Sequence, residues 1–166
     1  MADRLKRGLE TVVSPEYDTP GPGHTSEKGF SEREMDYQIA FLYSTYEQFI
    51  AFTNHFAQHF TIEGFGSSTT MLDALRAGYP ADAVVASVEN GGWELLEHLR
   101  SGPKFANIPV ILLTQQLSAP IIQRARAMKA DDIFEADFTE GNMLQRIQFF
   151  WKRKRYQTST AAQRVH

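Results

Sequence analysis

Cysteine is absent from this chain of 166 residues. Its absence excludes a disulfide framework, a cysteine nucleophile and every thiolate metal site. Long apolar runs are absent too: no stretch approaches the roughly 20 residues that span a bilayer. The N-terminal sequence MADRLKRGLETVV lacks the hydrophobic centre of a secretory leader. The formal net charge of −3 gives no general attraction to nucleic acids or anionic membranes. We therefore expect a cytoplasmic protein without membrane insertion.

The two ends of the chain differ in composition from its middle. Hydrophobic residues make up 42% of the whole, which is typical of a folded domain. Residues 14–30, SPEYDTPGPGHTSEKGF, are rich in proline, glycine, serine and charge, and residues 156–166 are small and polar. Such segments contain too little apolar surface to fold alone. The sequence therefore predicts a flexible arm over residues 1–36, one domain over residues 37–155 and a flexible tail over residues 156–166.

Apolar runs of strand length alternate with stretches of helical periodicity between the two ends. The predicted strands are Tyr37–Tyr43, Thr61–Phe65, Ala83–Val88, Pro109–Thr114 and Asp132–Glu135. The predicted helices are Thr45–Phe60, Thr70–Ala77, Trp93–Arg100, Ala119–Lys129 and Thr139–Lys154. This alternation predicts an α/β fold, with a parallel sheet covered by helices on both faces.

Three stretches resemble the receiver domain of bacterial two-component response regulators. They are PADAVVASVENGGWELLEHLRS, IPVILLTQ and MKADDIFEADFTEGNMLQRI, which keep that family's order, spacing and hydrophobic pattern. The resemblance extends over about Asp36–Arg153. It implies the flavodoxin-like (CheY-like) receiver fold, a five-stranded parallel sheet in the order 2-1-3-4-5 with helices on both faces. In such a sheet the functional groups gather at the carboxyl ends of the strands.

The phosphorylation site of that family depends on residues that this chain lacks. In the family an acid pair after the first strand and an aspartate ending the third strand hold magnesium, and that aspartate accepts the phosphoryl group. A hydroxyl residue and a lysine, after the fourth and fifth strands, contact the phosphate. The matching positions here are Tyr43, Ser44, Ser87, Thr114 and Ala136. Only Thr114 fits the pattern, and Ile133 stands where the family commonly has an aromatic residue. The resemblance therefore implies a pseudo-receiver without catalytic residues or a cofactor.

Other interpretations of the strand ends depend on neighbouring polar residues. Ser87 and Thr114 suggest a small polar pocket, but the simpler interpretation is that their hydroxyls bond to each other or to the backbone. Glu89 and Asp137 are candidates for a cation site that would lack the acid pair magnesium requires. Residues 64–70 match no nucleotide-binding fingerprint, and their serines and threonines predict helix caps.

The first predicted helix carries an apolar stripe and a candidate partner surface. The apolar stripe consists of Tyr46, Phe49, Ile50, Thr53, Phe56, Ala57 and Phe60. Phe52, His55 and His59 fall on the other side, where an exposed aromatic residue is a typical interface anchor. The histidine spacing can clamp a metal, but no third ligand is apparent, so surface histidines are the simpler interpretation. The resemblance implies that this helix docks a histidine kinase, a phosphotransfer protein or a scaffold protein.

A second candidate surface is the face that receivers use for homodimers, formed by the fourth helix, the fifth strand and the fifth helix. Here Arg124 and Lys129 accompany Asp131, Asp132 and Glu135, an alternation that suits self-association through ion pairs. The basic run 152–155 complements the dipole at the end of the last helix. No helix-turn-helix pattern accompanies that run, so nucleic-acid binding ranks last among the hypotheses.

The leading functional hypothesis is a non-phosphorylatable pseudo-receiver that binds a protein in a bacterial two-component-type or polar-localisation pathway. One alternative is the regulatory N-terminal domain of a larger ATPase or other effector. Another is a small-ligand sensor that uses the vacated phosphorylation pocket.

Overall fold

The computed structural model describes residues 37–136 and 140–165. Its strands are β1 (Gln38–Leu42), β2 (Thr61–Phe65), β3 (Ala83–Ser87), β4 (Val110–Thr114) and β5 (Asp132–Glu135). Its helices are α2 (Tyr46–Phe56), α3 (Ser68–Arg76), α4 (Gly92–Ser101), α5 (Ala119–Ala127) and α6 (Glu140–Val165), with a 3-10 turn η2 (Val88–Asn90). All four strand pairs are parallel and their order is β2-β1-β3-β4-β5. The predicted flavodoxin-like receiver fold is confirmed.

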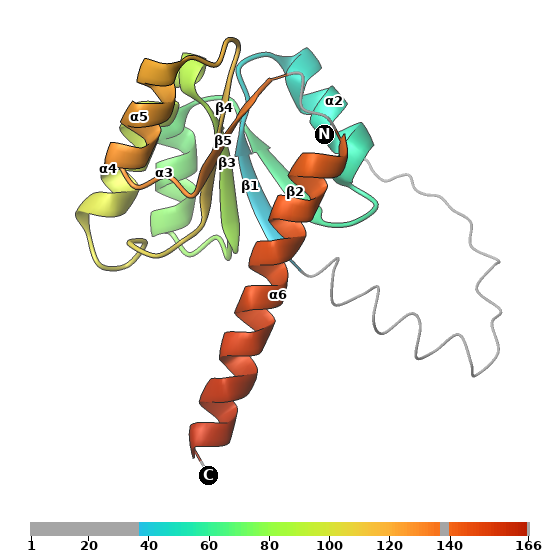
Figure 1. Ribbon diagram of the computed structural model, residues 1–166, viewed down its shortest axis with the longest axis vertical. Helices are drawn as coiled ribbons and strands as arrows, with labels where there is room; N and C mark the ends of the chain where they lie inside the picture. Colours follow the sequence, from blue (N-terminus) through green and yellow to red (C-terminus); the bar gives the residue numbers. More distant parts are fainter. Residues whose placement is uncertain (1–36, 137–139, 166) are drawn as a thin grey trace, which may run out of the picture. The chain divides into compact units, whose positions relative to one another are not determined.

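Helices cover both faces of the sheet (Figure 1): α2 and α6 lie on one face, and α3, α4 and α5 on the other. Alternate residues of the central strands supply the two cores, as the two-residue period of a strand requires. In β4, Ile111 belongs to the core under α2 and α6, whereas Leu112 belongs to the core under the other three helices. Every residue of β3 and β4 is buried, which explains their unbroken apolar runs.

Hydroxyl side chains begin three of the helices. Thr45, Ser67 and Ser118 each accept a hydrogen bond from the backbone N–H three residues later. These are N-caps, which satisfy donors that the first turn of a helix leaves unpaired. The interpretation of residues 64–70 as a turn and helix cap is thus confirmed.

Helix α2 turns a different side toward the sheet from the one predicted. Phe52 is 0% exposed, and its ring lies 4.3 Å from the ring of Phe41, centroid to centroid. The prediction that Phe52 is an exposed anchor was therefore wrong. Tyr46 and Ile50, expected in the core, are 59% and 41% exposed. Apolar residues surround most of this helix, so periodicity alone does not determine which of them face the sheet.

Two helix ends also differ from the predictions. Helix α2 ends at Phe56 rather than at Phe60. Helix α6 continues from the predicted end at Lys154 to Val165, so most of the segment predicted as a tail is helical. Residues 155–165 contain neither glycine nor proline, the two residues that most strongly oppose a helix. None of the described helices is both long and apolar enough to cross a membrane. The arm predicted over residues 1–36 lies outside the described residues.

The connection from β3 to α4 requires two glycines. Gly91 has φ 89°, in the left-handed region that glycine enters without steric cost. A Cβ atom on Gly92 would lie 2.7 Å from the carbonyl oxygen of Ser87. The helix therefore begins so close to the end of β3 that no side chain fits between them.

We expect Gly92→Ala to lower the free energy of unfolding by about 1 to 3 kcal/mol, because the added methyl group must displace backbone atoms. Gly102→Ala is the matched control, since a Cβ atom there would meet nothing within 4 Å. Urea unfolding of both variants measures the difference. Equal losses of stability would contradict the packing argument.

The amino edge of the sheet is held by partly buried polar side chains. The Asp82 carboxylate accepts a hydrogen bond from the backbone N–H of Gln38 at 2.8 Å and pairs with Lys154. Nearby, the Tyr79 hydroxyl donates to Gln38 Oε1 at 3.3 Å. Burial, followed by the charges of Glu63 and Asp82, raises the pKa of Tyr79 to about 12. The folded state thus favours the neutral phenol.

This shift predicts a loss of stability at alkaline pH. The unfolded phenol titrates near its ordinary value of about 10. The contribution of Tyr79 is therefore complete below pH 10 and is lost as the pH rises through about 12. Replacing Tyr79 with Phe should flatten the dependence of the unfolding free energy on pH in this interval. An alkaline stability profile that is the same in both proteins would contradict the assignment.

Candidate functional site

The carboxyl edge of the sheet brings together the residues predicted at the phosphorylation site. Leu42 pairs with Ala86 across β1 and β3, and Thr114 pairs with Glu135 across β4 and β5, so all these strands end at the same edge. The five residues gathered there are Tyr43, Ser44, Ser87, Thr114 and Ala136. Ser87 and Thr114 are buried, with 0% and 1% of their surfaces exposed.

A glutamine from helix α2 lies between two of these residues. The Ser87 hydroxyl donates to Gln48 Oε1 at 2.6 Å. The backbone N–H of Ser44 donates to the same oxygen at 2.8 Å, and the Ser44 hydroxyl lies 3.2 Å from it. The serine that stands where the family has its phosphorylated aspartate is therefore bonded within the protein. Nε2 of Gln48 is buried and has no hydrogen-bond partner in the part of the chain that the structure describes.

Gln48 was not among the predicted site residues, although the sequence contains a signal for it. Thr45 is the N-cap of helix α2, and Gln48 is the third residue after it. A Thr-x-x-Gln pattern is a capping box, in which the glutamine side chain turns back toward the residues before the helix. Here it turns back to Ser44 and continues to Ser87. The capping pattern predicts that direction, but not the contact with β3.

The second buried hydroxyl has a different partner. Thr114 Oγ1 donates to the Glu89 carboxylate at 3.0 Å, and the backbone N–H of Gln115 donates to the same oxygen at 2.8 Å. Thr114 Oγ1 also lies 3.5 Å from the backbone carbonyl oxygen of Gln116. The prediction that the two hydroxyls bond to each other or to the backbone was therefore wrong for Ser87, which bonds to a side chain, and is confirmed in part for Thr114. Gln48 reaches Ser87 from the first turn of α2, and Glu89 reaches Thr114 from the 3-10 turn after β3.

An asparagine joins the loops above this edge. Asn90 Nδ2 donates to the carbonyl oxygens of Tyr43 at 2.9 Å and of Gly66 at 2.8 Å. The loops after β1, β2 and β3 are therefore held together by one side chain. Together with Gln48 and Glu89, Asn90 connects the ends of four strands through hydrogen bonds that need no bound ion.

The predicted cation site has few ligands in this arrangement. Glu89 is the carboxylate nearest Thr114, and its Oε2 already accepts two hydrogen bonds. The other proposed ligand, Asp137, lies outside the described residues. Within residues 37–136 and 140–165, no three histidine, aspartate or glutamate side chains come together as a metal site.

The residues predicted to contact partners lie on separate parts of the surface. His55 and His59 are half-buried on α2 and in the turn that follows it, each with its ring 5.9 Å from the next phenylalanine ring, centroid to centroid. Arg124 stacks over the ring of Trp93 at 4.3 Å. Lys129 is exposed, and Ile133 packs against the core under α3, α4 and α5.

Two of the three acids of the predicted dimer face are paired with arginines within the chain. Asp131 pairs with Arg100 at 3.1 Å, and Asp132 pairs with Arg146 at 2.8 Å. These pairs leave fewer free charges for self-association than the sequence pattern predicts. Exposed ion pairs are weak in any case, so this face has little electrostatic reason to bind a second copy.

Several solved structures that share this fold come from response regulators and receiver domains. No protein-family model and no curated protein matches the sequence. A response regulator from Thermotoga maritima is 18% identical, with a TM-score of 0.62, over 70% of this chain and 98% of that one. A putative response regulator from Chloroflexus aurantiacus J-10-fl is 14% identical, with a TM-score of 0.64, over 70% and 98%. The receiver domain of a signal transduction histidine kinase from Syntrophus aciditrophicus is 17% identical, with a TM-score of 0.63, over 70% and 91%. At these identities the likeness shows the fold: this chain contains a receiver-like domain.

A double-mutant cycle on Gln48 and Ser87 tests the central hydrogen bond. We expect Gln48→Ala to lower the free energy of unfolding by about 1 kcal/mol or more, because it leaves the buried Ser87 hydroxyl unpaired. Ser87→Ala should lower it by about 0.5 to 1.5 kcal/mol, the net value of one hydrogen bond, since Gln48 Oε1 keeps its bond to Ser44. The double variant should lose less than the sum by at least about 0.5 kcal/mol. Gln58→Ala, on the exposed turn after α2, is the control and should stay within about 0.5 kcal/mol of the parent. Additive losses would contradict the bond.

Proposed function

We propose that this protein is a pseudo-receiver, a signalling domain that binds a protein partner without being phosphorylated. The observation that carries the proposal is the hydrogen bond from the buried Ser87 hydroxyl to Gln48. It places a neutral amide next to the residue that stands at the acceptor position. Receiver chemistry needs a carboxylate nucleophile and a cation at this point.

The chemistry of Ser87 supports the same conclusion. A serine hydroxyl is a weak nucleophile unless a base removes its proton. The acceptor of that proton here is the Gln48 carboxamide oxygen, which is not a base at neutral pH. The Glu89 carboxylate is bonded instead to Thr114 and to the backbone of Gln115. We infer that the domain is fixed in one arrangement, with its strand ends joined by hydrogen bonds.

Helix α2 offers the best surface for a protein partner. Its exposed apolar residues are Tyr46 and Ile50, which replace Phe52 as candidate anchors. Large aromatic side chains contribute strongly to interfaces when a partner covers them. A histidine kinase, a phosphotransfer protein or a scaffold protein would each suit this position. Gln48 belongs to the same helix. Its hydrogen bonds to Ser44 and Ser87 therefore hold the first turn of α2, where this surface begins, in a fixed position.

A second candidate function is that of a regulatory domain joined to a larger effector. It is favoured by helix α6, whose ribbon runs well past the edge of the sheet (Figure 1). A helix that leaves a domain in this way is suited to connect it to another one. The small-ligand sensor at the vacated pocket is less favoured, because Gln48 and Ser87 contact each other there.

The proposal predicts that acetyl phosphate and magnesium leave the protein unmodified. Intact-protein mass spectrometry should show no added phosphoryl group. Beryllofluoride with magnesium should leave the amide NMR signals of Ser87, Thr114 and Ala136 in place, because no carboxylate pair holds the metal. A magnesium-dependent phosphoryl adduct, or specific shifts of these signals, would contradict the proposal.

A restored variant supplies the positive control. It combines Tyr43→Asp, Ser44→Asp, Ser87→Asp and Ala136→Lys with Gln48→Ala, which removes the amide from the site. This variant should accept the phosphoryl group or bind beryllofluoride under the same conditions. Partner binding, once a partner has been captured, should be equal for the parent protein and for Ser87→Ala. Loss of the partner in Ser87→Ala, measured well below the thermal midpoint of that variant, would count against phosphorylation-independent binding.

A further inference from the structure

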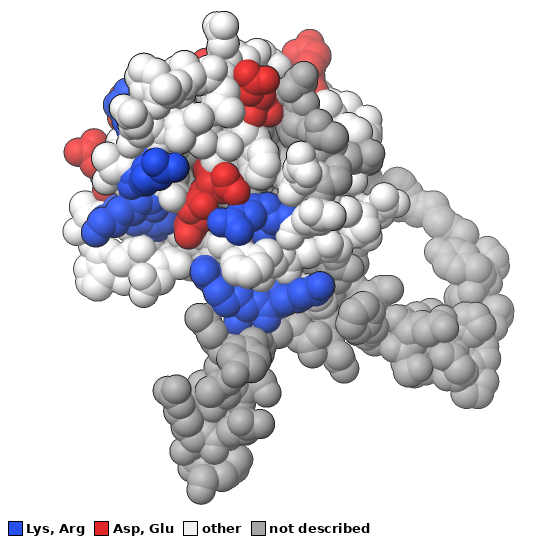
Figure 2. All heavy atoms as spheres, viewed as in Figure 1, with Lys and Arg blue, Asp and Glu red and all other residues white. Residues whose placement is uncertain are grey.

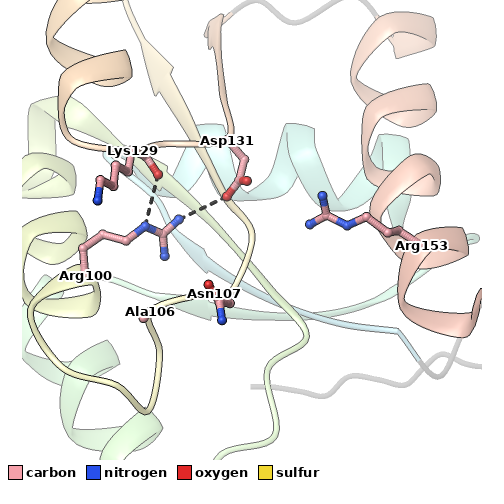
Figure 3. A pocket seen from close by; sticks show the side chains of 6 residues that line it. All are labelled: Arg100, Ala106, Asn107, Lys129, Asp131 and Arg153. Atoms are coloured by element: carbon pink, nitrogen blue, oxygen red, sulfur yellow. Dashed lines mark hydrogen bonds and ion pairs between the residues drawn. The ribbon is translucent and has the colours of Figure 1, made fainter. Parts of the chain in front are cut away.

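A hollow at the amino edge of the sheet is lined by positive side chains (Figure 3). Its volume is about 500 Å³, and its lining residues are Arg100, Ala106, Asn107, Lys129, Asp131 and Arg153. They come from the end of α4, the loop before β4, the turn after α5 and helix α6. Parallel strands place this edge at the opposite end of the sheet from Ser87 and Thr114. The hollow is therefore separate from the site of the proposed function.

One acid and one base of the hollow neutralise each other. The Asp131 carboxylate accepts from Arg100 Nη2 at 3.1 Å and from the backbone N–H of Val110 at 2.8 Å. The guanidinium of Arg100 also donates to the backbone oxygens of Lys129, Phe105 and Ile108. Arg100 thus serves mainly to hold the surrounding loops. The positive charges that remain available are those of Lys129 and Arg153.

These remaining polar groups have no partner among the described residues. The structure gives the Lys129 ammonium and the Asn107 carboxamide no hydrogen bond and no ion pair there. Arg153 forms no hydrogen bond and no ion pair with a described residue. Its guanidinium lies 5.8 Å and 5.1 Å from the ring centroids of Phe149 and Phe150, and its charge acts on Tyr37 against the larger effect of burial, which raises the pKa of that phenol. Its side chain extends from α6 toward Asp131 (Figure 3). Ring contacts hold the arm of an arginine and leave its N–H groups able to donate.

The backbone at Lys129 is strained. Its φ is 69°, and it is the one non-glycine residue with a positive φ in the part of the chain that the structure describes. The N–H of Ala130 bonds to the carbonyl of Ala125, which makes Lys129 the residue just past the end of α5, where glycine usually stands. A lysine costs stability at such a position, and strain of this kind collects at functional sites.

We propose that the hollow binds a soluble phosphorylated small molecule with at least two negative charges. An arginine offers the planar fork that matches a phosphate, and a lysine offers a compact charge. The volume of about 500 Å³ exceeds what a bare phosphate needs and lies in the range of small-molecule sites. Figure 2 shows lysine and arginine side chains gathered across this face, although the whole chain carries a formal net charge of −3. A local positive field of this kind attracts anions.

The test is a calorimetric titration with inorganic pyrophosphate, accompanied by amide NMR. Saturable binding should shift the signals of Asn107 and Lys129 and leave that of Ser87 unchanged. Lys129→Gly and Arg153→Gln should each weaken binding by about tenfold or more, since each removes a hydrogen bond to a charged group. Lys129→Gly should also keep or raise the thermal midpoint, because glycine suits a positive φ. Its loss of binding would then not reflect unfolding.

The control is Lys152→Gln, which removes one positive charge from the same helix without touching the hollow. It should leave the affinity for pyrophosphate nearly unchanged. A loss equal to that of Arg153→Gln, or no saturable binding by the parent protein, would overturn the proposal. Vesicles containing phosphatidylglycerol test the other source of phosphate. If these vesicles retain the protein through Lys129 and pyrophosphate does not displace it, the proposal is also overturned. Displacement of the protein from the vesicles by pyrophosphate would support the proposal.

Discussion

The carboxyl edge of the sheet depends on one constraint: a buried polar group must find a hydrogen-bond partner. Ser87 ends a strand on which every residue is buried, so its hydroxyl has no access to bulk water. Gln48 satisfies it, and the same oxygen also satisfies the backbone of Ser44. Because one oxygen serves both groups, the start of α2 and the end of β3 are held together. The neutral amide makes a connection for which receivers use charged groups and a metal.

The two edges of the sheet satisfy this constraint with different kinds of side chain. At the carboxyl edge, Gln48, Glu89 and Asn90 join neighbouring loops through hydrogen bonds. At the amino edge, Asp82 and Asp131 each accept a hydrogen bond from the N–H of a strand's first residue and pair with a base. The first edge is closed by hydrogen bonds and carries the Glu89 and Glu135 carboxylates. The second is open and, among the described residues, keeps Lys129 and Arg153 without an ion pair. Charge recognition by the described domain is therefore expected at the amino edge.

The sequence predicted an α/β fold because short apolar strands, buried at the centre of the sheet, alternate with helices. The strand order followed from the resemblance to receiver domains. The prediction that Ser87 and Thr114 lie at the same edge of the sheet followed from the fold, because the carboxyl ends of parallel strands meet there. Two features needed three-dimensional packing. Apolar residues surround most of α2, so periodicity could not decide between Phe52 and Ile50 as the buried residue. The direction of Gln48 depends on the cap at Thr45, and its contact with β3 depends on where α2 lies.

The hydrogen bonds at the carboxyl edge also limit how the domain can be regulated. A ligand shifts a conformational equilibrium only by the difference between its affinities for the two states. Phosphorylation cannot supply that difference if Ser87 accepts no phosphoryl group. A regulating molecule must then contact elements that can move relative to each other. The amino-edge hollow is a candidate, because two of its cations, Lys129 and Arg153, come from different elements, the turn after α5 and α6. An anion bound by both Lys129 and Arg153 would connect the turn after α5 to helix α6. The hydrogen bonds at the carboxyl edge do not connect these two elements.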